Sequence, residues 1–202
     1  MPYLQTGKLL FNRKSTTSVL WSVINLILKM DFTVRAAKPE DCKDVHRMIK
    51  ELAAYDKMPD HVQTSHEDLE KYGFSANPAF QCLVAEVPGE HKSKEGHTTV
   101  GYIVYFYTFS TWKGRSMYLE DIYVMPEFRG KGIGKALLSK VAAVARENQC
   151  VHLQLTVLDW NTPSQGFYFS NGAQDLTTIV GWRVLRFNGD ALDKLAKKDP
   201  KN

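Results

Sequence analysis

The stretch YLEDIYVMPEFRGKGIGKALL, residues 118–138, runs from aromatic and aliphatic residues through a glycine-rich turn into a helical pattern. Aromatic and β-branched residues over 116–124 predict a strand, and the spacing of apolar residues after the turn predicts a helix over 135–148. Glycines in such a turn let the backbone approach a ligand closely, and the helix N-terminus offers free N–H groups to an anion. The alternative interpretation is a flexible surface turn.

Two familiar nucleotide-binding motifs do not match this turn. A dinucleotide fingerprint, G-x-G-x-x-G, that starts at Gly130 requires glycine or alanine where Lys135 stands. A Walker A loop requires a glycine five residues before Gly134 and a hydroxyl residue after the lysine, but these positions hold Arg129 and Ala136. The turn is therefore typical of a phosphate cradle, but not of one for a nicotinamide dinucleotide or a nucleoside triphosphate.

Further elements extend on both sides of this stretch. The predicted strands are 32–36, 80–87, 100–109, 116–124, 151–157 and a final strand through Trp182, Val184, Leu185 and Phe187. Helices are predicted over 40–54, 135–148 and 164–170, and a capping box of Thr64 and Glu67 predicts a short helix to about Tyr72. The order β-α-α-β-β-β-α-β-α-β indicates an α+β fold with a mixed central sheet flanked by helices.

The charge of the chain is unevenly distributed. The 202 residues contain 26 Lys+Arg and 22 Asp+Glu, a formal charge of +4. Residues 1–30 hold four basic residues and no acidic one, so the remainder is formally neutral. A basic nucleic-acid-binding domain is therefore not expected. We expect an extension over 1–30, one domain over 31–195 and a solvated tail over 196–202.

The extension has three interpretations. Its basic and hydroxyl residues precede an apolar run over 19–28, which is too short to span a bilayer as a helix. It fits a mitochondrial transit peptide in composition, it fits a secretory signal poorly because no small-x-small site follows, and it fits a dispensable segment with Met30 as an alternative start. We expect a cytoplasmic protein without membrane association, or a mitochondrial one if the extension is a transit peptide.

No metal site is predicted. The three cysteines, Cys42, Cys82 and Cys150, are too widely spaced for a C-x-x-C motif, and they suit a reducing compartment. The six histidines form neither a helical i,i+4 pair nor a set paired with cysteines.

The pattern Arg129-x-x-Gly132-x-Gly134 at a strand-to-helix turn resembles the acetyl-CoA pyrophosphate loop of the GNAT superfamily of N-acetyltransferases. The wider text of 118–134 resembles the diamine acetyltransferases within it, the spermidine/spermine and thialysine enzymes. Matching text recurs at 50–56, 82–87, 159–161 and 172–176, and 111–115 with 158–161 favours the thialysine type. The resemblance covers about 31–195 and implies the GNAT fold, acetyl-CoA as co-substrate and a homodimer.

The resemblance also implies roles for particular residues. Glu120 would remove a proton from the amine through a water molecule, and Tyr168 would protonate the leaving thiolate. The alternatives are a solvent-facing acid for Glu120 and an aromatic packing residue for Tyr168. The implied acetyl-CoA residues are Ile122, Tyr123, Val124, Arg129, Gly130, Lys131, Gly132, Ile133, Gly134, Lys135, Asn161 and Ser164. The implied acceptor residues are Tyr55, Asp56, Glu120 and Asp121. A cluster of acids would attract a cation even on a neutral domain.

Three positions depart from the family pattern. Ile179-Val180 stands where the family carries an acid before Gly181, Ser110 replaces a further acid, and Phe169 replaces the basic residue after Tyr168. These departures weaken the case for a long polyamine and leave the residues for acetyl transfer intact.

We therefore expect an N-acetyltransferase that acts on a primary amine of a small cationic acceptor, either a thialysine-like amino acid or a di- or polyamine. The resemblance implies direct attack in a ternary complex, and no Ser or Cys has an evident neighbouring base that would indicate nucleophilic catalysis. The alternatives are a protein-lysine or N-terminal acetyltransferase, and a CoA-binding interaction module without turnover.

Overall fold

The computed structural model describes residues 30–197. Residues 1–29, the greater part of the expected extension, and 198–202 of the expected tail lie outside the described residues. The chain divides into two compact units at Thr156 and Val157, and each is described by itself. Over the described range, no helix has the length and apolar character needed to cross a membrane. The extent of the domain, 31–195, stays a prediction.

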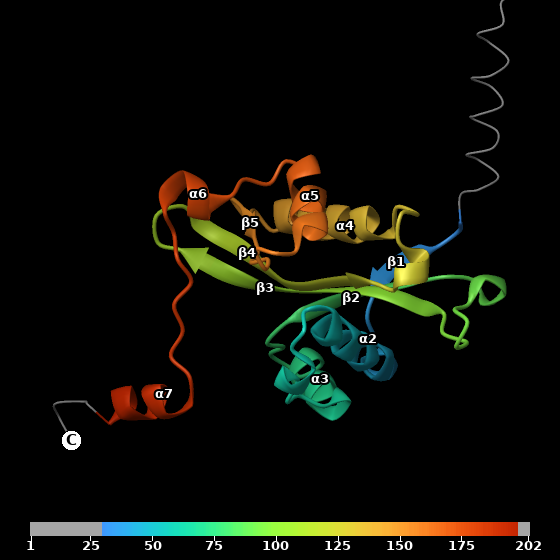
Figure 1. Ribbon diagram of the computed structural model, residues 1–202, viewed down its shortest axis with the longest axis horizontal. Helices are drawn as coiled ribbons and strands as arrows, with labels where there is room; N and C mark the ends of the chain where they lie inside the picture. Colours follow the sequence, from blue (N-terminus) through green and yellow to red (C-terminus); the bar gives the residue numbers. More distant parts are fainter. Residues whose placement is uncertain (1–29, 198–202) are drawn as a thin grey trace, which may run out of the picture. The chain divides into compact units, whose positions relative to one another are not determined.

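The first unit is built on a five-stranded mixed sheet, with the strands in the order β1-β2-β3-β4-β5 (Figure 1). The strands are β1 (Thr33–Ala36), β2 (Gln81–Glu86), β3 (Thr99–Ser110), β4 (Gly114–Val124) and β5 (Leu153–Gln154). The first three pairings are antiparallel and the pairing of β4 with β5 is parallel. The predicted α+β fold with a mixed sheet is confirmed.

The long ladder between β3 and β4 contains one irregularity, which lies at Glu120. Val104 pairs with Asp121, but the next residue of β3, Tyr105, pairs with Leu119, so Glu120 is an extra residue in β4. Such a β-bulge reverses the alternation of side chains along the strand. Leu119 and Asp121 therefore point to opposite faces of the sheet, whereas an uninterrupted strand would place both on one face.

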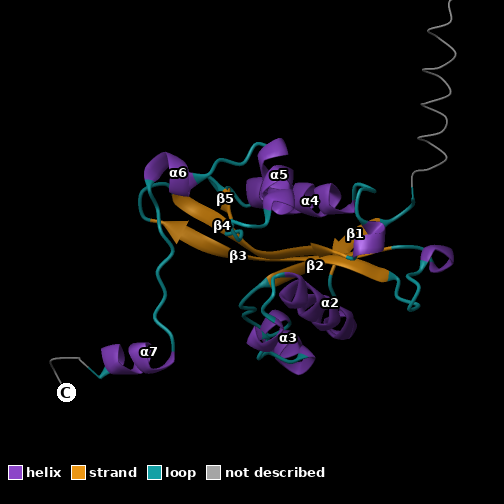
Figure 2. Cartoon of the chain, in the orientation of Figure 1, coloured by secondary structure: helices purple, strands orange, loops and turns teal. Residues whose placement is uncertain are grey.

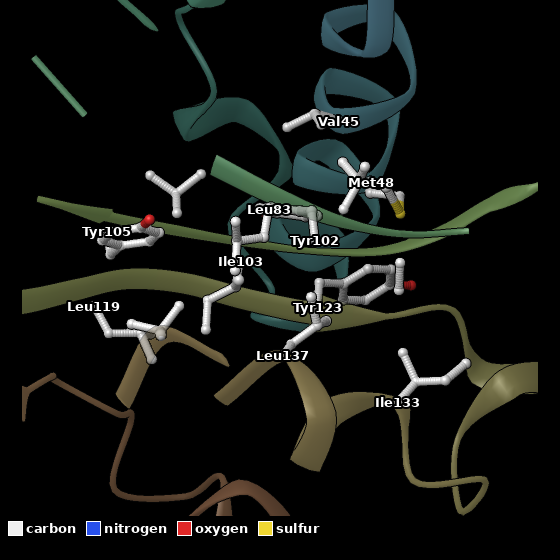
Figure 3. Close-up of a cluster of buried hydrophobic side chains, with 14 of the residues drawn as sticks. Val45, Met48, Leu83, Tyr102, Ile103, Tyr105, Leu119, Tyr123, Ile133 and Leu137 are labelled. Carbon is white, nitrogen blue, oxygen red and sulfur yellow. The ribbon is translucent and has the colours of Figure 1, made fainter. Parts of the chain in front are cut away.

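Helices cover both faces of this sheet (Figure 2). The helices α2 (Cys42–Tyr55) and α3 (His66–Gly73) lie on one face, and α4 (Ile133–Glu147) lies on the other. The helices α2 and α4 each bury one apolar stripe, as amphipathic helices do when they pack on a sheet. Figure 3 shows Val45 and Met48 of α2 and Leu137 of α4 on either side of sheet residues that include Ile103. The strands β3 and β4 thus lie between two layers of helices.

The second unit contains three short helices and no strand among its described residues. They are α5 (Thr162–Ser170), α6 (Leu176–Val180) and α7 (Gly189–Ala196). The predicted final strand through Trp182–Phe187 is wrong for this chain, because residues 182–188 form no regular element and their side chains are exposed. An alternating apolar pattern shows only that a segment can pair, and a strand also requires a neighbouring backbone to complete its hydrogen bonds.

Two other predictions need correction. The strand expected over 151–157 is reduced to the two residues of β5. The capping box of α3 lies one residue later than predicted, at Ser65 and Asp68. The Ser65 hydroxyl oxygen accepts a hydrogen bond from the Asp68 N–H at 3.2 Å, and the Asp68 carboxylate accepts one from the Ser65 N–H at 2.9 Å. Thr64 and Glu67 have the same spacing, so the sequence pattern alone did not distinguish the two pairs.

Candidate active site

The glycine-rich turn connects the end of β4 to the start of α4. A short 3₁₀ helix, Pro126–Phe128, follows β4, and the buried side chain of Phe128 anchors it. Gly130 and Gly132 then have positive φ angles of 74° and 88°, which glycine adopts without the steric cost that other residues incur. A Cβ atom at either glycine would meet no atom within 4 Å. The turn therefore has open space beside its backbone.

The N-terminus of α4 lies at this turn. The Ala136 N–H donates to the Gly132 carbonyl oxygen at 2.9 Å, so the N–H groups of residues 133–135 precede the hydrogen-bond ladder of the helix. Neither a capping side chain nor an acidic residue occupies this first turn. Lys131 and Lys135 are exposed there. Free N–H groups, the helix dipole and these two lysines suit the binding of a phosphate group.

The third cation of the turn, Arg129, is directed toward other protein groups. Its Nε donates to the Val124 carbonyl oxygen at 2.8 Å. Its guanidinium carbon lies 5.4 Å from the ring centroids of both Tyr55 and Tyr123. Arg129 therefore joins the turn to residues on β4 and at the end of α2, in addition to any contact with an anion.

Upstream on β4, Glu120 and Asp121 differ strongly in their surroundings. Glu120 is exposed at the bulge. Asp121 is largely buried, and its Oδ2 accepts a hydrogen bond from the hydroxyl of the fully buried Tyr102 at 3.3 Å. Burial, together with the negative charges of Glu120 and Asp56, raises the pKa of Asp121 to about 6, although the Tyr102 hydrogen bond opposes this rise. Asp121 therefore titrates close to neutrality.

Asp56 lies at the C-terminal end of α2, where the helix dipole is negative. Burial raises the pKa of Asp56, and its Oδ1 is buried without a hydrogen-bond partner among the described residues. The preceding residue, Tyr55, is 37% exposed. An unpaired carboxylate oxygen, a helix C-terminus and the nearby acids of β4 together suit a cationic ligand. The fold thus brings together four predicted acceptor residues, Tyr55, Asp56, Glu120 and Asp121, in the first unit.

The remaining predicted site residues lie in the second unit. Asn161 is the N-cap of α5, and its Oδ1 accepts a hydrogen bond from the Ser164 N–H at 3.2 Å. Tyr168 is buried on α5, and its ring meets that of Phe167 edge-on, with 5.4 Å between centroids. Phe169 is exposed. The Asn161 cap explains why α5 begins at residue 162. The roles of Asn161, Ser164 and Tyr168 toward acetyl-CoA stay predictions.

Sequence reasoning missed two residues of the site. Tyr102 looks like a core residue of an alternating strand, and only its pairing with Tyr123 places its hydroxyl beside Asp121. Glu51 accepts a hydrogen bond from the Tyr123 hydroxyl at 2.9 Å, although 72 residues separate the two. No sequence spacing signals such long-range pairs. Among residues 30–197, no group of three or more His, Cys, Asp or Glu side chains could hold a metal ion.

The raised pKa of Asp121 predicts a specific dependence of stability on pH. Because the folded state holds the Asp121 proton more tightly than the unfolded state, the stability contributed by this proton is present below about pH 4 and lost as pH rises through about 6. Asp121→Asn should therefore gain stability relative to the wild type as pH rises across this window, by on the order of 1–3 kcal/mol. Urea unfolding between pH 4 and 7.5 measures the difference.

Asp60→Asn, a change at an exposed aspartate of the same unit, is the matched control and should follow the wild-type curve. Parallel stability curves for Asp121→Asn and the wild type across this range would contradict the assignment.

Comparisons with known proteins agree with this geometry. The family model described as "Acetyltransferase (GNAT) family" matches residues 45–172. A thialysine N-ε-acetyltransferase of Bos taurus is 48% identical over 165 residues, which cover 82% of this chain and 97% of the relative. The spermidine/spermine N(1)-acetyltransferase-like protein 1 of Homo sapiens is 40% identical over 165 residues, 82% of this chain and 24% of that longer protein.

A solved structure gives the same result for the fold. The integron cassette protein VCH_CASS6 from the mobile metagenome of V. cholerae has a TM-score of 0.66 and 29% identity, and the match covers 84% of this chain and 99% of that one. The turn, the sheet and these relatives together lead to one assignment: the chain belongs to the acetyltransferase (GNAT) family, in its diamine acetyltransferase group, and is an N-acetyltransferase.

Proposed function

We propose that this enzyme transfers the acetyl group of acetyl-CoA to a primary amine of a small cationic acceptor, by direct attack in a ternary complex. The observation that carries the proposal is the arrangement along β4. An acidic cluster, Asp56, Glu120 and Asp121, lies at the bulge, and an anion-binding turn follows the end of the same strand. From Glu120 to Val124 a strand rises about 13 Å. An extended ligand with phosphates at one end and an acyl group at the other suits this separation.

The residues of the turn fit acetyl-CoA. The N–H groups of 133–135 and the lysines Lys131 and Lys135 would hold the pyrophosphate, and the space beside Gly130 and Gly132 admits it. The backbone of Ile122, Tyr123 and Val124 would hold the pantetheine arm. When bound, this co-substrate supplies the acetyl thioester. Asn161 and Ser164 are proposed as further contacts to it.

The acidic cluster serves the proton that the amine must lose. A lysine-like ammonium has a pKa of about 10.4, so it enters charged and is not nucleophilic. Glu120, exposed at the bulge, would accept the proton through a water molecule, and Asp121 would help to attract the cation. The Tyr168 hydroxyl would hold a proton for the leaving sulfur.

We assign the acceptor to thialysine-like amino acids or short diamines. Support comes from the thialysine N-ε-acetyltransferase of Bos taurus, which is 48% identical to this chain. Further support comes from two departures from the family pattern that remove acids, Ser110 and the exposed pair Ile179-Val180. Without those acids a distal second ammonium would lack a partner.

Turnover assays with a panel of amines test this function. Release of CoA thiol is measured with thialysine, lysine, putrescine and spermidine, and kcat/KM should be higher for thialysine and the short amines than for spermidine. Peptides with free lysines or a free N-terminus serve as the comparison. Tight acetyl-CoA binding without turnover of any small amine would reject the proposal, and turnover of peptides alone would assign the protein-acetylating alternative.

Two substitutions test the proton-transfer roles. Glu120→Gln should lower kcat by about 10²- to 10⁴-fold near neutral pH, with partial recovery as pH approaches the pKa of the amine. Tyr168→Phe keeps the ring that packs on Phe167 and should lower kcat. Tyr118→Phe is the matched control, since it removes a β4 hydroxyl that bonds to Thr156 at 3.0 Å and should leave turnover intact. Wild-type turnover in Tyr168→Phe would remove Tyr168 from the mechanism.

A homodimer is part of the proposal. The side chains of Trp182, Val184, Leu185 and Phe187 are 56–86% exposed and form an apolar segment with strand-like alternation. Exposed segments of this kind mark protein–protein contacts. A second copy of the chain would cover the segment and complete its backbone hydrogen bonds.

Light scattering with size-exclusion chromatography tests the dimer. The wild type should have twice the 23.0 kDa mass of the chain. Val184→Asp combined with Leu185→Asp should shift it toward the monomer, because burying unpaired carboxylates is unfavourable. Tyr72→Ser, which removes a half-exposed ring on α3, should not. A wild-type monomer at assay concentrations would reject the dimer.

A further inference from the structure

Arg129 occupies a position between the glycine turn and the end of α2. Its Nε–H is engaged by the Val124 carbonyl oxygen at 2.8 Å. Its guanidinium group lies against two aromatic rings, those of Tyr55 and Tyr123, at 5.4 Å from each centroid. Cation–π contacts of this geometry are attractive, and a planar guanidinium can contact two rings at once. One side chain thus links the last turn of α2, the end of β4 and the turn that follows.

One of these two rings is held rigidly. Tyr123 is buried, and its hydroxyl donates to Glu51 Oε2 at 2.9 Å. Glu51 pairs through its other oxygen with Arg47, which also donates to the Thr99 carbonyl oxygen at 3.2 Å. Burial, with the bond to Glu51, raises the pKa of Tyr123 to about 12, so its phenol stays neutral and remains a donor. Arg129 therefore packs on a ring, that of Tyr123, whose position is fixed by these contacts.

The other ring belongs to the acceptor side. Tyr55 is the last residue of α2, and Asp56 with its unpaired oxygen follows directly. The backbone here leaves the helix, with Lys57 at a positive φ of 62°. The end of a helix is the part most prone to fraying, so side-chain contacts there decide its position.

We propose that Arg129 is a positioning residue: it holds the C-terminal turn of α2 against the end of β4, and so places Tyr55 and Asp56 for the amine. The inference rests on the proposed function, which supplies the amine acceptor. Arg129 would thus affect the binding of the acceptor amine, in addition to the phosphate contact expected of a cation in this turn. Lys131 and Lys135, exposed at the same turn, are available for that contact.

Arg129→Lys separates the two roles, because lysine keeps the positive charge but lacks the Nε–H and the planar group that stacks on two rings. At saturating acetyl-CoA, kcat/KM for the amine should fall about 3- to 30-fold, which corresponds to the loss of one or two cation–π contacts. Lys135→Gln should instead raise the KM for acetyl-CoA and leave the KM for the amine unchanged.

Arg115→Lys is the matched control. Arg115 also lies on β4, and its guanidinium carbon lies 4.0 Å from the ring centroid of a tyrosine, Tyr107, but it stands at the start of the strand, whereas the glycine turn follows the end of the strand. Its substitution should leave both KM values at the wild-type level.

A measurement without turnover completes the test. The amides of residues 56–58 donate to the last carbonyl groups of α2 at 2.8–3.1 Å, so hydrogen exchange there reports the order of this turn. Exchange should be faster in Arg129→Lys than in the wild type and in Arg115→Lys. When Arg129→Lys is added to Tyr55→Ala, exchange should increase little further, since both substitutions remove the same contact between Arg129 and the Tyr55 ring.

The outcomes are distinguishable. Unchanged exchange at 56–58, together with a rise confined to the KM for acetyl-CoA, would overturn the positioning role and leave Arg129 as a phosphate contact. If the wild type acetylates no amine, the proposed function fails, but the exchange comparison still decides whether Arg129 orders the end of α2.

Discussion

The antiparallel ladder between β3 and β4, with its single bulge at Glu120, is the constraint on which the site depends. Side chains alternate along a strand, so the register of this ladder determines which residues of β4 face α2 and which face α4. The extra residue reverses that alternation once, between Leu119 and Asp121. Leu119 stays in the core, and Asp121 comes to lie beside the Tyr102 hydroxyl. β-Bulges are frequent next to active sites for this reason.

The same strand connects two regions of opposite electrostatic character. At the bulge, the negative charges of Glu120 and Asp56 help to raise the pKa of Asp121, and burial raises the pKa of Asp56, which makes the region favourable for a cation. Beyond Val124, the N-terminus of α4 and the lysines of the turn favour an anion. A formal charge of +4 for the whole chain reveals neither region. Local charges held by the sheet, and not the net charge, distinguish these two regions.

Arg129 shows how one side chain connects these regions. It belongs to the motif of the turn, yet the groups it contacts are a carbonyl oxygen of β4 and two tyrosine rings. The network behind Tyr123, through Glu51 and Arg47, extends this connection into α2. Residues from three separate segments of sequence, α2, β4 and the turn, thus contact one another around Arg129.

The sequence by itself determined the parts that depend on local chemistry. The glycines of the turn, the apolar spacing of α4 and the aromatic strands were predictable, because backbone freedom and side-chain periodicity act over a few residues. The resemblance to the family predicts roles for Glu120, Asp121 and Tyr168, and these roles stay predictions. Only the tertiary structure decided the bulge at Glu120, the burial of Asp121 beside Tyr102 and the unpaired state of 182–187. Each of these depends on which distant backbone or hydroxyl group lies alongside, and no pattern within the segment encodes that neighbour.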